Sequence, residues 1–233
     1  MTEAAELLQR IDDRTWRGLP LDLRWKIIPW AIEGGELDHA VRLIDAMERE
    51  RGESAKLIEL RIRVASARND AAEQGRLLEL RAERHPSTTA TVQLARFLLD
   101  QGEVERAAEL YEAVRQTSGD QQQVKHLGTV VDHALTPPPS DLHPRLRREL
   151  DADPDGFWPN VFMATWLLDN DRAGDARPLL HTVLEDAVEL GYESYLTRLA
   201  ELLERAGEPS IAADLRARVA AERDERRSSL QAQ

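Results

Sequence analysis

One short pattern constrains the fold of this chain more than any other feature. In "FLLDQGEVERAAELYEAV", Gly102 separates two stretches whose apolar residues lie three or four positions apart, which is the spacing of one helical face. Two such helices joined by a short glycine turn form an antiparallel pair. Ala95 and Ala107, one on each helix, would let the two backbones approach closely. This stretch is therefore predicted to be a helix-turn-helix unit.

The same unit recurs along the chain. Its turns are predicted at intervals of 33 to 37 residues, near Gly35, Asn69, Gly102, Leu135, Asn170 and Gly207. A period near 34 residues is typical of a solenoid, in which each helical pair buries its apolar face only by stacking on its neighbours. The sequence thus predicts an all-α fold, a right-handed α-α superhelix (solenoid) of about six antiparallel helix-turn-helix repeats.

These repeats resemble those of the tetratricopeptide-repeat (TPR) family. The family motif is a helix of the form large-x-x-large-small-x-x-large, then a glycine turn, then a second helix that opens near a small residue. The resemblance covers roughly Leu21 to Arg227, and it is clearest around Gly35, Gly102 and Gly207. Related helical-pair solenoids with a looser consensus are the alternative.

Three repeats depart from the family pattern. The second has Gln74 at the small position, the fourth has "TPPPSD" in place of a glycine turn, and the fifth carries Pro159 and an extra residue or two. The remaining small residues keep a packing role in this interpretation. Ala107 and Gly128 are predicted to be close-contact positions between paired helices.

The repeats suggest how the chain is divided. Residues 1–20 are expected to form an N-terminal capping helix and a linker, with Leu7, Leu8 and Ile11 on the apolar face of the helix. Residues 21–227 form the TPR-like domain, with a proline-rich break at 136–140 because consecutive prolines cannot continue a helix. Residues 228–233 are expected to be a polar tail that frays.

Composition excludes several classes of protein. A net charge of −12 opposes a nucleic-acid backbone, so no nucleic acid is expected as a partner. The absence of cysteine excludes disulfides, thiolate metal sites and a cysteine nucleophile. No basic-then-apolar leader opens the chain, and no apolar run approaches the roughly 20 residues of a membrane span. A cytoplasmic protein with no membrane association is expected, and the bias toward Arg and Ala is typical of a GC-rich bacterial genome.

The sequence holds no convincing catalytic or metal site. His126 and His133 share a helical face but lie too far apart for one metal ion. His133 and His143 could converge with Asp132 or Asp141, although solvated histidines beside a loop are the ordinary case. Phosphate-binding glycine loops and the HExxH and GxSxG motifs are absent. The sequence therefore predicts no enzyme, no metal and no cofactor.

A binding surface follows from the family resemblance. In that family the first helices of successive repeats line a concave face. The positions that match it here are Arg63, Val92, Arg96, Leu99, Lys125, Thr129 and Asn160. Arg63, Arg96 and Lys125 would form a basic strip able to take the carboxylates of an acidic, extended peptide. The alternative is that these cations pair with Glu59, Asp100 or Asp132 on the same surface.

Tryptophans offer a second kind of contact. Trp25 and Trp158 are possible aromatic anchors for a partner, because aromatic residues are over-represented in binding pockets. Core burial is the more usual fate of each tryptophan, and it is expected for Trp16, Trp30 and Trp166.

Together these features predict a non-catalytic adaptor or scaffold that binds another protein or a peptide through a concave helical face. The alternative is a regulatory or sensor module that binds a signalling peptide or small ligand and changes its superhelical shape. Homo-oligomers are possible in either case. Fold alone does not choose between these functions.

Overall fold

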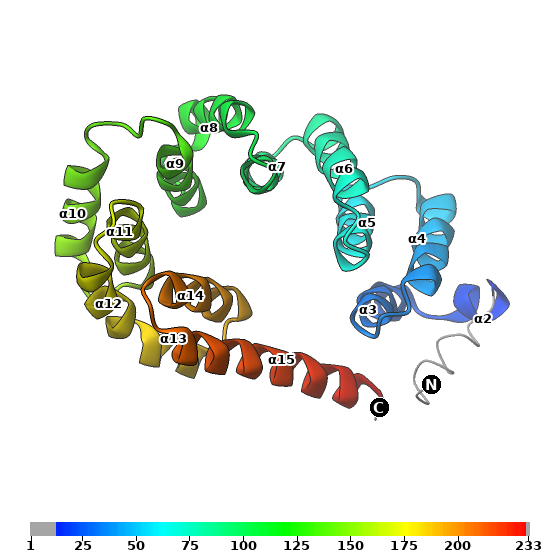
Figure 1. Ribbon diagram of the computed structural model, residues 1–233. Coiled ribbons are helices and arrows are strands. Elements are labelled where there is room, and N and C mark those ends of the chain that lie inside the picture. Colours follow the sequence, from blue (N-terminus) through cyan, green and yellow to red (C-terminus); the bar gives the residue numbers. More distant parts are fainter. Residues whose placement is uncertain (1–12, 232–233) are drawn as a thin grey trace. The chain divides into compact units, whose positions relative to one another are not determined.

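The computed structural model describes residues 13–231, and every regular element in that range is an α-helix (Figure 1). The helices are α2 (Asp13–Gly18), α3 (Leu21–Glu33), α4 (Leu37–Arg51), α5 (Ala55–Ala67), α6 (Ala71–Arg84), α7 (Thr88–Asp100), α8 (Val104–Ser118), α9 (Gln122–Ala134), α10 (Leu142–Ala152), α11 (Phe157–Asp169), α12 (Ala173–Thr182), α13 (Leu184–Leu190), α14 (Glu193–Arg205) and α15 (Pro209–Gln231). The predicted all-α class is confirmed. Leu7, Leu8 and Ile11 of the expected capping helix, and residues 232–233 of the expected tail, lie outside the described residues.

Five of the six predicted turns share one backbone geometry. Each contains a residue with positive φ, namely Gly35, Asn69, Gly102, Asp171 and Gly207. The N–H of the next residue donates to the carbonyl five positions back, at 2.8 to 2.9 Å in every case. This bond closes the end of the first helix and is typical of a glycine C-cap. The turns therefore join α3 to α4, α5 to α6, α7 to α8, α11 to α12 and α14 to α15.

The fifth turn lies one residue later than predicted. Asp171, with φ of 57°, takes the left-handed position. Asn170 instead ends the preceding helix, and its Nδ2 donates to the carbonyl oxygen of Trp166 at 2.7 Å. Asparagine and aspartate both tolerate the left-handed region, so sequence alone did not distinguish the two neighbours.

A small residue follows four of these turns by five positions. Those residues are Ala40, Ala107, Ala176 and Ala212, each with no exposed surface. The second pair has Gln74 at this place, and Gln74 is only half-buried. Its neighbour Gly75 is a close-contact position, because a Cβ built there would lie 2.8 Å from Cε1 of Phe97. Gly75 thus admits the Phe97 ring of α7, which belongs to the next pair.

Gly128 is also a close-contact position, although its neighbour differs from the prediction. A Cβ at Gly128 would lie 2.5 Å from the hydroxyl oxygen of Tyr111. Tyr111 is on α8, so the close approach joins the third pair to α9 rather than α9 to its own partner helix. The glycine was identified correctly, and the contacting helix was not.

The fourth and sixth repeats contain the irregular connections. Residues 135–141 link α9 to α10 without a left-handed residue, and the Thr136–Pro137 peptide bond is cis. The spacing before the last turn is longer because α13 is inserted between α12 and α14. Pro159 falls in the first turn of α11, where a missing N–H costs no helical bond.

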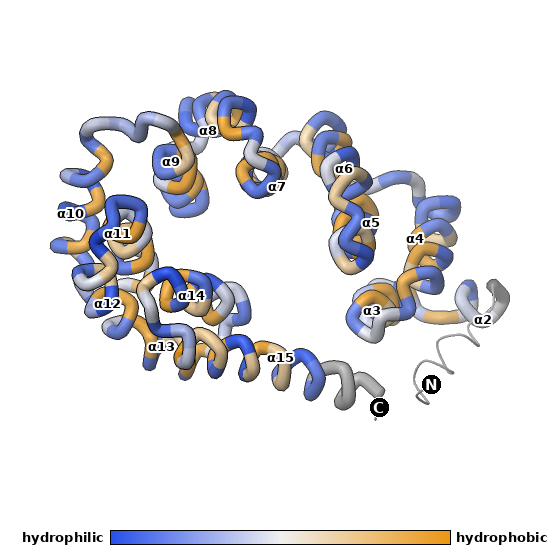
Figure 2. Tube along the Cα trace, viewed as in Figure 1, coloured by the Kyte–Doolittle hydropathy of each residue, from blue (hydrophilic) through white to orange (hydrophobic). Residues whose placement is uncertain are grey.

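The chain divides into two compact units, one that takes the residues up to Val131 and those from Arg226 on, and another that covers Asp132–Glu225. The boundary lies inside α9, just before the proline-rich segment. The core of the first unit includes Ile28, Ile44, Met47 and Leu57, which have almost no exposed surface. The core of the second includes Leu146, Leu180, Leu199 and Leu203. Figure 2 shows the hydrophobic and hydrophilic stripes along the helices that this packing requires.

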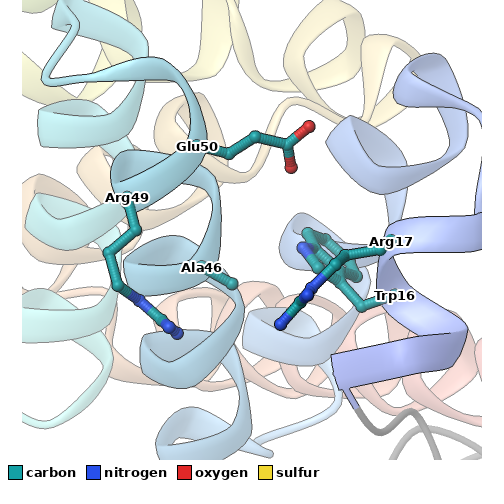
Figure 3. Close-up of a pocket in the computed structure, with 5 residues that line it drawn as sticks. All are labelled: Trp16, Arg17, Ala46, Arg49 and Glu50. Atoms are coloured by element: carbon teal, nitrogen blue, oxygen red, sulfur yellow. The ribbon is translucent and has the colours of Figure 1, made fainter.

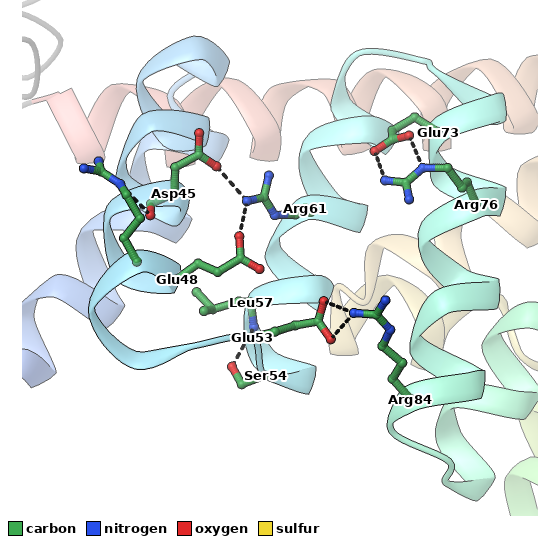
Figure 4. A network of polar contacts seen from close by, with 10 residues as sticks. Asp45, Glu48, Glu53, Ser54, Leu57, Arg61, Glu73, Arg76 and Arg84 are labelled. Carbon is green, nitrogen blue, oxygen red and sulfur yellow. Dashed lines mark hydrogen bonds and ion pairs between the residues drawn. The ribbon is translucent and has the colours of Figure 1, made fainter.

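Arginines bridge neighbouring helices in the first unit (Figure 4). Arg61 of α5 donates to both Asp45 and Glu48 of α4, at 2.6 Å each. Arg84 of α6 contacts Glu53, just before α5, at 2.8 Å. Each exposed pair adds little stability by itself, and together they fix which helix faces lie opposite one another. Many of the arginines of this acidic chain are used in this way.

Candidate functional site

The predicted basic strip lies on the first helices of the second, third and fourth pairs. Arg63 is on α5, Arg96 on α7 and Lys125 on α9. Arg63 forms an ion pair with Glu33 of α3, with 3.0 Å between Nη2 and Oε1, and both side chains are partly exposed. The predicted alternative partner Glu59 pairs with Arg81 instead. Arg63 is therefore already neutralised by the preceding pair.

Arg96 and Lys125 form the exposed part of this strip. Both side chains are exposed. Burial, and then the positive charge of Arg96, lower the pKa of His126, which follows Lys125 on α9. The field of Arg96 thus reaches the neighbouring first helix, where the second exposed cation lies.

Three of the predicted groove residues are buried. Val92 is 4% exposed, Thr129 is 6% exposed and Asn160 has no exposed surface. Thr129 bonds to the carbonyl oxygen of Lys125 within α9, at 3.3 Å. Asn160, in the second unit, donates to the carbonyl oxygens of Pro154 and Gly156 at 2.7 and 2.9 Å. These side chains pack or fasten the backbone, and Leu99 is half-buried.

Both predicted aromatic anchors are half-buried. Trp25 packs against the core of the first unit, and Nζ of Lys56 lies 4.1 Å from the centroid of its ring. Trp158 stacks on Phe162 with their ring centroids 5.5 Å apart. It belongs to an aromatic cluster of the second unit in which Phe157 stacks on Tyr195.

Of the three other tryptophans, Trp16 is 2% exposed and fits the prediction of burial. Trp166 is half-buried, packs against the second core and stacks on His143. Trp30 is 39% exposed, so its predicted burial is wrong. Its neighbours Ala31 and Ile32 supply the buried face of α3, which turns Trp30 outward.

The histidines of the second unit do not gather around a shared polar centre. Nδ1 of His133 lies 3.7 Å from a carboxylate oxygen of Asp169, whereas His143 stacks on Trp166. Asp132 is paired with Arg145. Burial lowers the pKa of His133 despite the opposing charge of Asp169. Within residues 13–231, no three His, Asp or Glu side chains are arranged to hold a metal ion.

A pocket that sequence reasoning missed lies between α2 and α4 (Figure 3). It measures about 420 Å³, and it is lined by Trp16, Arg17, Ala46, Arg49 and Glu50. Arg24 of α3 is 7% exposed and bonds to Glu50 at 2.6 Å. Helical periodicity assigns polar residues to the exposed face of a helix, so the sequence did not indicate that Arg24 is buried. The proximity of Trp16 and Arg17, adjacent in the chain, was the one available hint.

Comparisons with known proteins add little to this geometry. No protein-family profile matches the sequence, and no curated protein matches it. Among solved structures, a chain titled "MamA RS-1 ArsTM double mutant" is 16% identical, with a TM-score of 0.41, and the match covers 76% of this chain and 98% of that one. The fold is a TPR-like helical repeat on the strength of its own turns and small-residue positions. Within the described range, no helix is both long and apolar enough to cross a bilayer.

Proposed function

We propose that the protein is a non-catalytic adaptor that binds another protein by holding an acidic, extended segment against the first helices of its first unit. The observation that carries this proposal is the exposed pair of cations, Arg96 on α7 and Lys125 on α9. They occur in a chain of net charge −12 whose other arginines are largely engaged with carboxylates of the chain itself.

Successive first helices suit an extended partner. Packed helices lie about 10 Å apart, so cations on consecutive helices would contact carboxylates several residues apart along an extended chain. Arg63 extends the surface by one more helix. Its ion pair with Glu33 is partly exposed, so a carboxylate of the partner can replace Glu33 at little net cost. The positive field would also speed association, in a way that salt weakens.

A direct test uses two labelled peptides, ten glutamates and ten glutamines, titrated by fluorescence anisotropy at low and moderate salt. The glutamate peptide should bind, and the glutamine peptide should not. Arg96→Gln should weaken binding of the glutamate peptide about 5- to 10-fold, because one charged hydrogen bond at a partly exposed site is lost.

The matched control is Arg115→Gln. Arg115 is an exposed arginine on α8, the second helix of the same pair, and it bonds to Glu112 within its own helix. The Arg115→Gln variant loses the same charge from another surface, so its affinity for the glutamate peptide should stay within about twofold of wild type. Equal binding of the two peptides, or equal losses for Arg96→Gln and Arg115→Gln, would refute the proposed surface.

A further inference from the structure

The helix inserted in the sixth repeat ends in two exposed apolar side chains. Leu190, the last residue of α13, is 55% exposed, and Tyr192, the N-cap of α14, is 56% exposed. Among residues 15–225, no other large apolar side chain is more than 39% exposed. Gly191, between these two residues, is left-handed with φ of 63°, and its N–H closes the last turn of α13 at 3.1 Å. A defined turn therefore presents both side chains to solvent.

Tyr192 is the outer ring of the aromatic cluster in the second unit. It meets Tyr195 edge to face, with ring centroids 5.4 Å apart and an interplanar angle of 73°. Tyr195 in turn stacks on Phe157 with centroids 3.9 Å apart, and both of these rings pack against the core. The exposed Tyr192 ring thus rests on a support that is itself fixed by the core.

The chain around this ring is acidic. Residues 184–195 contain Glu185, Asp186, Glu189 and Glu193 and no Lys or Arg. Glu193 forms an ion pair with an arginine of α15. Glu185, Asp186 and Glu189 are exposed, and none of them forms an ion pair in the part of the chain whose side chains are described. The negative charge of α13 is therefore not neutralised by the protein itself.

We propose that the α13 surface, formed by Leu190, Tyr192 and the exposed carboxylates of α13, binds a basic, arginine-containing segment of a partner protein. A guanidinium can lie over a tyrosine ring and donate hydrogen bonds to a neighbouring carboxylate, because it is planar and carries several N–H groups. Asp186 and Leu190 are four positions apart and share a face of α13, so a charged and an apolar contact lie side by side. Insertions in repeat proteins often lie on the binding face.

Charge favours this occupant over a second copy of the chain. A symmetric dimer would place the α13 surface against itself and bring the unpaired carboxylates of both copies together. Like charges facing one another across an interface are costly, whereas a basic segment neutralises them. The partner is also opposite in charge to the acidic segment proposed for α7 and α9, so this inference adds a second partner to the proposed adaptor.

The test uses two labelled peptides, five arginine–glycine units and five citrulline–glycine units, titrated against the full chain by fluorescence anisotropy. Citrulline keeps the size and shape of arginine without its charge. The arginine peptide should bind saturably, and the citrulline peptide should bind at least about tenfold more weakly, because it loses both the cation–π contact and the charged hydrogen bonds. Equal affinities for the two peptides overturn the proposal.

Variants of the exposed ring locate the bound peptide. Tyr192→Leu should weaken binding of the arginine peptide about fivefold, because the ring is lost while an apolar side chain remains. Tyr192→Phe should stay within about twofold of wild type, since it keeps the ring. The matched control is Trp30→Leu, which removes an exposed ring from α3 of the first unit and should also stay within about twofold. Unchanged affinity for Tyr192→Leu, or equal losses for Tyr192→Leu and Trp30→Leu, refutes the surface.

A second pair of variants separates the α13 surface from the net charge of the protein. Glu189→Gln should weaken binding about threefold, as expected for one exposed ion pair. Glu109→Gln removes the same charge from an exposed residue of α8 that, within residues 15–225, also forms no ion pair, and it should have less than half that effect. Equal losses in the two variants would show a general charge effect and refute the proposal.

Sedimentation velocity tests the competing occupant. Wild type and Tyr192→Leu should have the same mass in solution. A dimer that Tyr192→Leu dissociates would identify a second copy as the occupant and overturn the proposal. None of these results depends on the adaptor surface on α7 and α9.

Discussion

The second and third helical pairs build the same turn from different residues. In the third pair, Gly102 has φ of 78° and the next N–H bonds five residues back at 2.8 Å. In the second pair, Asn69 has φ of 55° and the corresponding bond is 2.9 Å. The positions five residues later differ more, because Ala107 is fully buried and Gln74 is only half-buried.

This difference shows that the repeat imposes two separate requirements. The turn needs a residue that tolerates the left-handed region, and glycine or asparagine can meet that need. Close helix packing needs a small volume at the contact, and the place of that volume can shift. In the second pair the adjacent Gly75 provides a small volume toward Phe97 of the following pair. A mismatch at one consensus position therefore need not break the repeat.

The largest expected effect tests the packing requirement directly. Ala107→Leu should cost about 2 to 3 kcal/mol of unfolding free energy, because the added methyl groups enter a fully packed contact. Gln74→Leu, at the corresponding position, should change it by less than about 0.5 kcal/mol because that site is half-buried. Urea denaturation of both variants measures the difference. If the two losses are equal, the positions are not distinguished by packing.

The next effect concerns the glycine that adjoins the third pair. Gly128→Ala should cost about 1 to 2 kcal/mol, because Gly128 is buried and its Cβ would meet the ring of the half-buried Tyr111. In a Tyr111→Leu background the same change should become neutral or stabilising, since alanine favours a helix over glycine by about 1 kcal/mol. A double-mutant cycle measures this coupling. Additive effects would mean that the ring does not constrain Gly128.

The same change at Gly75 should be milder. Both rings are half-buried, but Gly75 is half-buried whereas Gly128 is buried, so the Phe97 ring has more room to move away from a methyl group. Comparison of Gly75→Ala with Gly128→Ala therefore serves as the control for burial at the two junctions between successive pairs.

The smallest effect tests the turn itself. Gly102→Ala should cost about 1 kcal/mol, since a Cβ is disfavoured at positive φ. Asn69→Gly should lie within about 0.5 kcal/mol of wild type, because glycine accepts that backbone but loses more entropy on folding. Thermal unfolding of both variants measures the two losses of stability. A larger loss for Asn69→Gly than for Gly102→Ala would show that the asparagine side chain, and not the backbone, maintains the turn.

For the candidate adaptor surface, the sequence indicated which helices carry the residues but not which of those residues are exposed. The period placed Arg63, Arg96 and Lys125 on first helices, as the structure has them. It did not establish exposure, because Val92 and Thr129 share those helices and are buried. A rotation of one position about a helix axis, about 100°, moves a side chain from the surface to the interior. Packing against neighbouring helices sets that rotation.

The sequence by itself determined the all-α class, the period and five of the six turns to within one residue, because each of these turns depends on residues within about five positions of one another. Tertiary structure alone decided which charges are paired and where a pocket opens. Glu33 neutralises Arg63 from 30 positions away, and Glu50 meets Arg24 across 26. Such pairs depend on how separate helices pack, which local propensity does not encode. The same long-range packing buries Trp16 beside Arg24.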